Sequence, residues 1–383
     1  MELLDASIVP EHARDRKLAA RAFAAEEIEP VAADYHASGA YPWDVLEAAM
    51  DAGFVAQHIS PEYGGRGDGL AELLAIAEEF FRVDAGIALT IQLAGFGCDI
   101  LEQHGTEEQK DQYLRPVAEN DQLSGLAVSE PQTGSDLAGM STEATKVAGG
   151  YELSGEKYWV GNAVEADWLT VYAKTGNRED RYSNYSLFVV ETDREGYHAD
   201  HVPEKIGMRA SKQGHIVLED CFVPETNLIG TEGGGFYMLA DFFNKGRVIV
   251  GGHGIGLAAA AIEEAEQFVD DREAFGRTIN EFQAVQHAIA EMRLRFEAAR
   301  ALVWRACRKV QAGENPGYWA ALAKTYGTEA ATFCAERSMQ LHGGRSVFAD
   351  RRISRVYRDV RIPVIYEGAN EIQRNLIYKH RPR

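Results

Sequence analysis

The stretch Ile365-Tyr366-Glu367-Gly368-Ala369-Asn370-Glu371-Ile372-Gln373-Arg374 lies near the C-terminus of the chain. It places one carboxylate, Glu367, between a tyrosine and a glycine, after the apolar approach Ile362 to Ile365. A carboxylate in apolar surroundings tends to have a raised pKa and can accept a proton near neutral pH. Taken alone, the stretch also fits a partly exposed glutamate in a loop before a helix, so its meaning depends on the rest of the chain.

The composition bounds the class of protein. The chain has 383 residues, of which 45% are hydrophobic, enough for two or three domains with a sizeable core. Its net charge of −20 disfavours nucleic acid and anionic membranes as partners. No uninterrupted run of about 18 apolar residues occurs, and the N-terminus has no apolar signal-peptide core, so we expect no membrane insertion.

The cysteines and the basic residues indicate the compartment. The four cysteines are far apart with no C-x-x-C spacing, so we expect free buried thiols in a reducing cytoplasm and no metal site: Cys98, Cys221, Cys307 and Cys334. The 39 basic residues comprise 28 arginines and 11 lysines, against 59 acidic residues. This acidic excess with scarce lysine favours a halophilic source, and an ordinary acidic enzyme is the alternative.

Hydrophobic periodicity divides the chain into three predicted domains, at residues 1–119, 120–232 and 233–383. The first domain has helical spacing of apolar residues at 17–28, 43–54, 69–82 and 86–103. Thr106 and Gln109 have the spacing of a capping box that opens a further helix. The first domain is therefore predicted to be all helical.

The second domain changes to a period of two, and the third returns to helical spacing. Alternating runs at 167–172, 186–190 and 215–218 predict strands, and Ser154-Gly155 is typical of a hairpin turn. In the third domain, apolar residues from Phe282 to Val310 recur in steps of three and four and predict one long helix that Gly313 ends. Its narrow apolar seam suits a helix bundle or a subunit interface.

Two motifs of the second domain have residues that suit a cofactor site. In Leu126–Asp136, LAVSEPQTGSD, the hydroxyls of Ser129 and Ser135 flank a turn whose amides can hold a flavin edge and a phosphate. In Lys157–Asn162, KYWVGN, Trp159 precedes small residues and can lie against a planar ring. An ordinary turn and a core tryptophan are the alternatives when each motif is taken alone.

Two motifs of the third domain suit phosphate. Arg272–Arg277, REAFGR, offers guanidinium groups that are always charged and present forked donors to phosphate oxygens. Gln340–Gly344, QLHGG, supplies a glycine pair that lets a pyrophosphate approach the backbone. Solvated arginines and a helix C-cap are the alternatives.

These motifs, in this order and with this helix–strand–helix texture, resemble the acyl-CoA dehydrogenase family over essentially the whole chain. The resemblance implies an α+β multi-domain fold: an N-terminal α-helical domain, a central β-barrel and a C-terminal four-helix bundle. It also implies FAD in the cleft between them, and a homotetramer built as a dimer of dimers. The adenosine part of FAD then reaches into a neighbouring subunit.

The resemblance also assigns roles to residues at matching positions. Glu367 matches the catalytic base, and Ser135, Asn244, Arg247 and Gly368 match residues that contact the acyl-CoA. The implied contacts with the flavin and pyrophosphate are Val128, Ser129, Gly134, Ser135, Trp159, Gly161, Ala369 and Glu371. The implied contacts with the ADP part, across the dimer interface, are Arg272, Phe275, Gln283, Gln340, Gly343 and Gly344.

The implied reaction is α,β-dehydrogenation of an acyl thioester in fatty acid metabolism. Glu367 removes the α-proton, the β-hydrogen leaves as hydride to the flavin, and the product is a trans-2-enoyl-CoA. An electron-transfer flavoprotein usually accepts the electrons. A flavin oxidase or monooxygenase on the same fold, and a catalytically silent paralogue acting as a scaffold, are the competing interpretations.

The chain departs from the common family pattern at four positions. Gly161 stands where many relatives have Thr, and Asn244 replaces a common Asp. Ala369 and Glu371 replace a common Thr and Gln, which puts their flavin contacts in doubt. Gly246 occupies the position where some relatives carry the base, so Glu367 must serve here. Ala88 stands where glutaryl-CoA dehydrogenases carry an arginine for the distal carboxylate, which disfavours a dicarboxylyl substrate.

Overall fold

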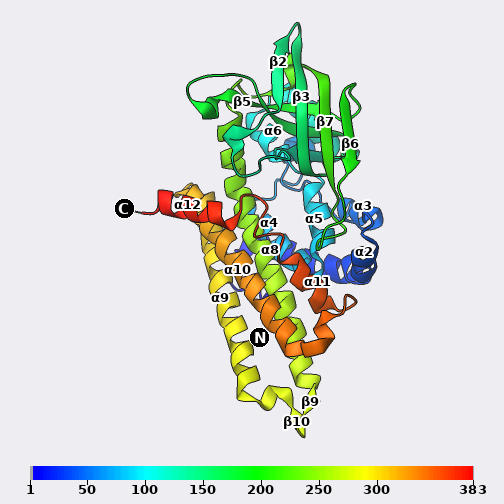
Figure 1. The fold of residues 1–383 in the computed structure, drawn as a ribbon, viewed down its shortest axis with the longest axis vertical. Helices are drawn as coiled ribbons and strands as arrows, with labels where there is room; N and C mark the ends of the chain where they lie inside the picture. The colour runs from blue at the N-terminus through cyan, green and yellow to red at the C-terminus, as the bar shows by residue number, and fades with distance from the viewer. Residues whose placement is uncertain (1–2, 383) are drawn as a thin grey trace.

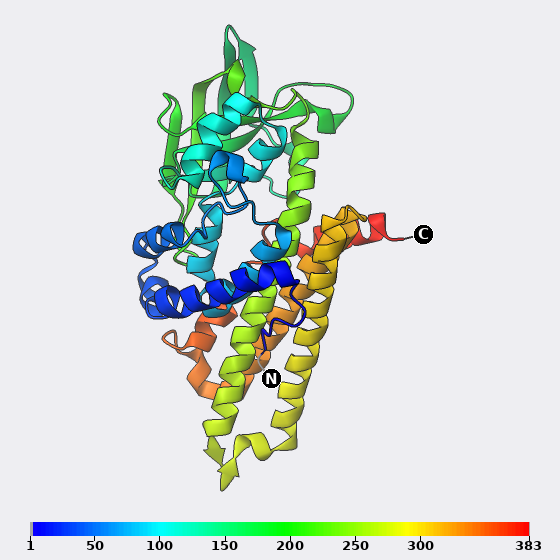
Figure 2. The same ribbon diagram turned by 180° about the vertical axis from the view of Figure 1, so that it is seen from behind.

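The computed structural model describes residues 3–382, so the predicted domain ends at residues 1–2 and 383 lie outside it. The first group of elements is helical, and Figure 2 shows it in blue to cyan lying across the long helices of the C-terminal part. Its helices are α1 (Glu11–Phe23), α2 (Ala32–Ser38), α3 (Trp43–Asp51), α4 (Leu70–Val83), α5 (Ala85–Leu93), α6 (Cys98–His104) and α7 (Glu107–Ala118).

The second group forms one mixed sheet, drawn in green at the top of Figure 1. Its strands are β1 (Ser124–Ala127), β2 (Glu143–Val147), β3 (Gly150–Gly161), β4 (Trp168–Lys174), β5 (Tyr185–Glu191), β6 (Tyr197–His201), β7 (Gln213–Pro224) and β8 (Leu228–Ile229). They follow the order β6-β7-β3-β2-β4-β5-β8, and β1 pairs with β4 in parallel. Helix α7 covers β4, where Tyr113 packs on Trp168 with ring centroids 5.5 Å apart. All residues of β4 except Lys174 are buried, and Tyr113 contributes to this cover at the first residue of the strand.

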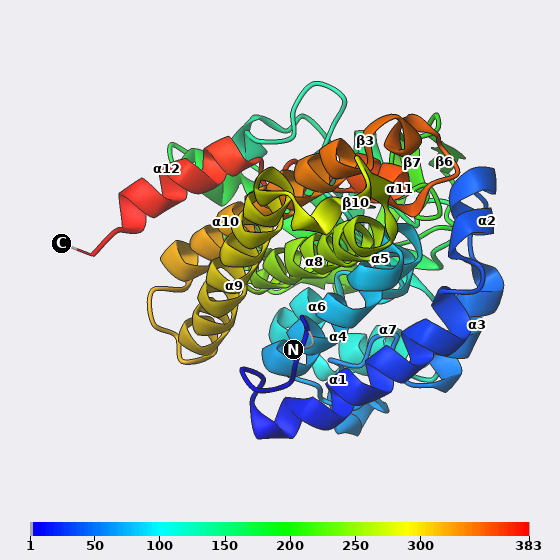
Figure 3. The ribbon, with the colours of Figure 1, turned by 90° about the horizontal axis from the view of Figure 1, so that it is seen from below.

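The third group is built on three long helices that run side by side in Figures 1 and 3. Its elements are α8 (Gly235–Asp271), β9 (Glu273–Ala274), β10 (Arg277–Thr278), α9 (Gln283–Gln311), α10 (Pro316–His342), α11 (Arg352–Asp359) and α12 (Asn370–His380). Helices α8 and α10 approach closely because glycines meet at their crossing. A Cβ on Gly254 would lie 2.4 Å from the Gly327 backbone, so a side chain there would force the helices apart.

The local predictions are mostly confirmed. Thr106 Oγ1 accepts from Gln109 N at 3.2 Å, and Gln109 Oε1 accepts from Thr106 N at 2.9 Å, as the capping box predicts. The long helix predicted from Phe282 to Val310 is α9, and Gly313 follows its end with φ of +69°. The three strand runs fall in β4, β5 and β7, and the four cysteines are free and buried.

Two local predictions are wrong. Ser154-Gly155 is not a hairpin turn: it lies inside β3, at an irregularity in the pairing with β7. Gly155 is needed there because a Cβ would lie 2.7 Å from Thr142 Cα, so the glycine marks a close backbone approach. The segment 86–103 is not one helix either. It forms two helices, α5 and α6, and the turn between them includes Gly97 with a φ of +96°.

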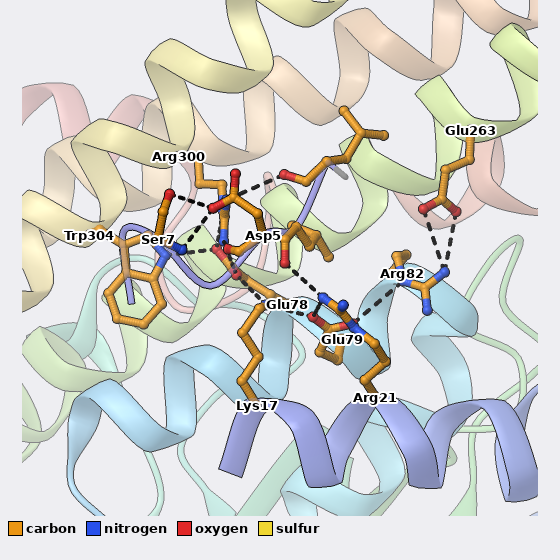
Figure 4. Close-up of polar contacts among 12 residues, drawn as sticks. Asp5, Ser7, Lys17, Arg21, Glu78, Glu79, Arg82, Glu263, Arg300 and Trp304 are labelled. Carbon is orange, nitrogen blue, oxygen red and sulfur yellow. Dashed lines mark hydrogen bonds and ion pairs between the residues drawn. The ribbon is translucent and has the colours of Figure 1, made fainter. Parts of the chain in front are cut away.

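A buried ionic network joins the N-terminal helices to the C-terminal ones (Figure 4). Lys17 on α1 lies 2.9 Å from Glu78 and 2.6 Å from Glu79 on α4, and all three side chains are fully buried. Arg300 and Trp304 on α9 donate to Glu78 at 3.1 and 2.9 Å. Because each buried charge has an opposite partner and further hydrogen bonds, the network fixes how α1, α4 and α9 pack together.

Helix α8 is long and apolar enough to cross a membrane by length and composition alone. However, 83% of its most apolar window is buried inside the molecule. That burial is the pattern of a core helix, in agreement with its glycine contacts to α10. The predicted domain limits at 119/120 and 232/233 fall between elements, after α7 and before α8, and stay predictions.

Candidate active site

A cavity of about 1080 Å³ lies where the three groups of elements meet. Helix α5, the turn after β1, the end of β3, helix α8 and the loop before α12 all contribute to its wall. The predicted site residues that line it are Val128, Ser129, Gly134, Ser135, Trp159, Gly161, Asn244, Arg247, Glu367 and Gly368. Residues more than two hundred positions apart in the sequence are therefore brought to one cavity.

The loop that carries Glu367 is held by its backbone. The backbone carbonyl of Glu367 accepts from Arg247 Nε on α8 and from Gln373 Nε2 on α12, each at 3.3 Å. The next carbonyl, of Gly368, accepts from Lys324 Nζ on α10 at 2.8 Å. Glu367 and Gly368 have φ of +51° and +88°, so these contacts hold two successive left-handed residues in place.

The side chain of Glu367, unlike its backbone, is not fixed at Oε2 by a hydrogen bond. Oε2 is buried and has no hydrogen-bond partner among the described residues. Burial raises the pKa of this carboxyl to about 7, although Arg247 and Lys324 act in the opposite direction. Burial also lowers the pKa of Lys324 to about 8. Gly246 makes room for the carboxylate, since a Cβ there would lie 2.4 Å from Glu367 Oε2. The result is a desolvated carboxylate that is free to accept a proton.

The predicted flavin residues form one wall of this cavity. Trp159 stands at the end of β3 with φ of +59° and its side chain 55% exposed, so its ring is available to a flat ligand. Buried Lys157 donates to the carbonyl of Val128 at 2.9 Å and holds the turn that follows β1. A Cβ at Gly161 would lie 2.6 Å from Leu93 Cδ1, so Leu93 fills the space that a larger residue would need. An aromatic face beside a turn of amides and hydroxyls fits the ring system of FAD.

The residues predicted to bind the ADP part lie elsewhere. Arg272, Gly343 and Gly344 line an open groove of about 550 Å³ at the far ends of α8 and α10, beside β9 and β10. In Figure 1 these two strands lie at the opposite end of the molecule from the sheet. The other predicted residues near this end are exposed: Phe275 (94% exposed), Gln283 and Gln340.

Ala369 and Glu371 do not line the cavity. Gly368, which precedes Ala369, and Ile372, which follows Glu371, do line it. Ala369 is half-buried and Glu371 is exposed at the start of α12. The structure thus separates the predicted FAD residues into a flavin wall, a distant groove, and these two positions.

Sequence reasoning missed two residues that support the site. In the sequence, Lys324 is a single charged residue after the apolar run Ala320–Ala323, and nothing else there indicates a role. In the structure it is fully buried, which is rare for a lysine without a partner. It also contacts Asn370 Oδ1 at 2.8 Å, which ties α10 to the first residue of α12. Gln373 belongs to the opening motif, but its role as a donor to the Glu367 loop depends on contacts that only the fold supplies.

Profiles of three domains of one family match the chain: the acyl-CoA dehydrogenase N-terminal domain at residues 10–121, the middle domain at 125–221 and the C-terminal domain at 233–381. A probable acyl-CoA dehydrogenase of Mycobacterium tuberculosis, FadE25, is 34% identical over 96% of this chain and 94% of that protein. A 3-(aryl)acrylate reductase of Clostridium sporogenes is 33% identical over 96% and 97% of the two chains. The structure of an acyl-CoA dehydrogenase from Geobacillus kaustophilus matches with a TM-score of 0.91 and 32% identity, covering 97% of this chain and 98% of that one.

The buried carboxyl of Glu367 predicts a pH-dependent stability. Its pKa is near 7 in the folded protein and 4.5 without the fold, so the folded state binds its proton more tightly. The contribution of the protonated Glu367 carboxyl to the free energy of unfolding is fully present below about pH 4.5 and is lost as the pH rises through 7. We therefore expect Glu367→Gln to stabilise the cofactor-free protein at pH 8, by up to about 3 kcal/mol, and to change little at pH 5.

Thermal unfolding at the two pH values measures this difference. Glu371→Gln is the matched control, because Glu371 is exposed four residues away and the same charge is removed. Equal changes for the two variants at both pH values would show that Glu367 carries no desolvated charge.

Proposed function

The chain belongs to the acyl-CoA dehydrogenase family, and from that premise we propose that it oxidises an acyl-CoA thioester to the trans-2-enoyl-CoA. The protein is an FAD-dependent oxidoreductase of this family. The observation that carries the proposal is Glu367, whose Oε2 is buried and unpaired among the described residues, on the wall of a cavity of about 1080 Å³ that also holds the predicted flavin wall.

Glu367 is the proposed base for the α-proton of the thioester. With a pKa of about 7 it is about half ionised at neutral pH and basic enough to take a proton from carbon. The backbone N–H of Glu367 has no acceptor among residues 3–382, so it can donate to the thioester carbonyl. Negative charge that develops on that oxygen is then stabilised beside the base that creates it.

The other proposed substrate contacts lie around this point. Asn244, Arg247 and Gly368 line the same cavity as Ser135, and Arg247 anchors the base through its backbone carbonyl. Trp159 and the turn after β1 would hold the flavin of FAD, which would supply the acceptor for the hydride that leaves the β-carbon. We propose an electron-transfer flavoprotein as the partner that reoxidises the enzyme, and a role in fatty acid metabolism.

We also propose that two subunits share each FAD, in a homotetramer built as a dimer of dimers. Support comes from the separation of the flavin wall from the groove at Arg272, Gly343 and Gly344, which lies beside β9 and β10 at the end of the molecule opposite the sheet. Phe275 next to this groove is 94% exposed, although an aromatic side chain of this size is usually covered. A neighbouring copy supplies both the cover and the missing part of the cofactor site.

Three other functions are alternatives, each weighed on a specific observation. The similarity to a 3-(aryl)acrylate reductase favours the reverse reaction, reduction of an enoyl group, at the same site. A flavin oxidase or monooxygenase, or a silent scaffold, is less well supported because each leaves the unpaired Glu367 without a use. Anaerobic bleaching of the flavin by saturated acyl-CoA favours the dehydrogenase, whereas rapid reaction of the reduced enzyme with O₂ favours the oxidase.

The shared cofactor site predicts a coupled loss of FAD and of assembly. Arg272→Glu places a carboxylate in the groove proposed for the pyrophosphate, so both flavin content and oligomer mass should fall. Light scattering and flavin absorbance measure the two quantities. Arg115→Glu, at a partly exposed position of α7, makes the same charge change as a control. A fully flavinated monomer of the unchanged protein would contradict the shared site.

The charge composition predicts salt dependence, which would accompany a halophilic source and a cytoplasmic location. With 59 acidic against 39 basic residues, repulsion between surface charges should lower stability at low ionic strength. We expect the melting temperature to rise between low and molar KCl. An unchanged melting temperature would leave an ordinary acidic enzyme as the better description.

The proposed base predicts the behaviour of Glu367→Gln. The variant keeps its size and its FAD but cannot accept the α-proton, so flavin reduction by acyl-CoA should slow by about 10²–10⁴-fold or more. Anaerobic stopped-flow absorbance measures this rate, and Glu367→Asp should retain more activity than the Gln variant. A Gln variant that reduces its flavin at the unchanged rate would remove Glu367 from the reaction.

A further inference from the structure

His253 is a fully buried histidine on α8 that the proposed reaction does not use. Its side chain lines the catalytic cavity, and both ring nitrogens are hydrogen-bonded. Nδ1 lies 2.6 Å from the hydroxyl of Tyr366, and Nε2 lies 2.6 Å from Oε1 of Gln92 on α5. The ring also stacks on Phe81 of α4, with centroids 3.7 Å apart and planes 6° apart.

The direction of these hydrogen bonds follows from the atoms. An amide oxygen can only accept, so the Nε2–H of His253 donates to Gln92. Burial lowers the pKa of the imidazole to about 3, so the ring is neutral and Nδ1 accepts from the Tyr366 hydroxyl. Both ring nitrogens are therefore hydrogen-bonded, and the two hydrogen bonds fix the orientation of the imidazole ring.

The backbone beneath His253 is fixed as well. A Cβ on the preceding Gly252 would lie 2.5 Å from Leu74 Cδ1 on α4, and Gly254 meets Gly327 on α10. Helix α8 is thus clamped on two sides at this turn, and His253 cannot withdraw by a shift of its helix.

A second cavity, of about 460 Å³, lies behind this histidine. Phe81, which stacks on His253, lines the second cavity, whereas His253 lines the catalytic one. Gln92 and Phe96 line both. The lining of the second cavity is mixed: its apolar members include Ile76, Ala77, Phe80, Ile91 and Ile249, and its polar and charged members include Gln57, Asp68, Asp99, Glu102 and Lys245. Gln92, Phe96 and the stacked rings of His253 and Phe81 therefore form the partition that separates the proposed reaction site from the second cavity.

We propose that His253, held by Tyr366 and Gln92, closes the acyl end of the catalytic cavity and restricts this enzyme to short acyl groups. This inference rests on the proposed function and deepens it by naming the substrate class. A short acyl chain ends against the imidazole, which is neutral and presents a flat face. A long chain has to enter the second cavity, and it can do so only if the ring leaves two hydrogen bonds and its stacking partner. An uncompensated loss of those contacts opposes such a movement.

The acyl-length profile tests the proposal. For the FAD-loaded enzyme, kcat/KM should be highest for butanoyl-CoA or hexanoyl-CoA and lower for dodecanoyl-CoA by at least about tenfold. His253→Ala removes one of the side chains that divide the two cavities and leaves Phe81 without its stacking partner, so the ratio of the dodecanoyl to the butanoyl value should rise by about tenfold or more. His253→Gln is the matched control, because it refills the space with a polar side chain and should keep the preference for short chains.

Binding gives a second readout that does not depend on turnover. In the Glu367→Gln background, the change in flavin absorbance on adding dodecanoyl-CoA should indicate at least about tenfold tighter binding when His253→Ala is also present. If His253→Ala fails to fold, as judged by circular dichroism, Gln92→Ala opens the same partition from α5 and should shift the profile in the same direction.

The outcomes separate this inference from the function beneath it. An unchanged enzyme that oxidises butanoyl-CoA and dodecanoyl-CoA equally well, or an opened partition that leaves the acyl-length ratio unchanged, would overturn the role of His253 and leave the dehydrogenase intact. A flavin that no acyl-CoA bleaches would overturn the dehydrogenase itself.

Discussion

The burial of one carboxylate oxygen, Glu367 Oε2, without a hydrogen-bond partner among the described residues is the constraint on which the site depends. Left alone, Glu367 would gain by turning toward water or toward a cation. The structure instead ties its backbone through Arg247 and Gln373 and leaves Oε2 facing the space beside Gly246. Basicity is the consequence, because desolvation penalises the ionised form more than the two nearby cations favour it.

The scaffold holds that arrangement by joining elements that are distant in the sequence. Glycine contacts bring α8 against α10, and the Lys17–Glu78 network fixes α1 and α4 against α9. The cavity forms between these helices and the sheet, so its walls come from all three parts of the chain. The loop with Glu367 is attached to α8, α10 and α12, and the position of the base is therefore a property of the whole C-terminal part.

Local signals in the sequence predicted much of this, and contacts between distant residues account for what they missed. The capping box at Thr106 and the apolar seam of α9 are written in neighbouring residues, and both were confirmed. Gly155 was misread because a glycine that makes room for Thr142 looks like a turn residue until the partner strand is known. Lys324 and His253 had no sequence signal beyond an odd polar residue in an apolar run, since their partners lie far along the chain.

The pH dependence of kcat/KM for flavin reduction by acyl-CoA, under anaerobic conditions, tests the central claim most directly. This parameter reports the ionisation of the free enzyme. The account predicts a rate that falls as the pH drops below about 7, as one group takes up a proton, because protonated Glu367 cannot act as a base. A rate that stays constant from about pH 5 to about pH 9 would contradict it, since no buried carboxylate would then control the removal of the α-proton.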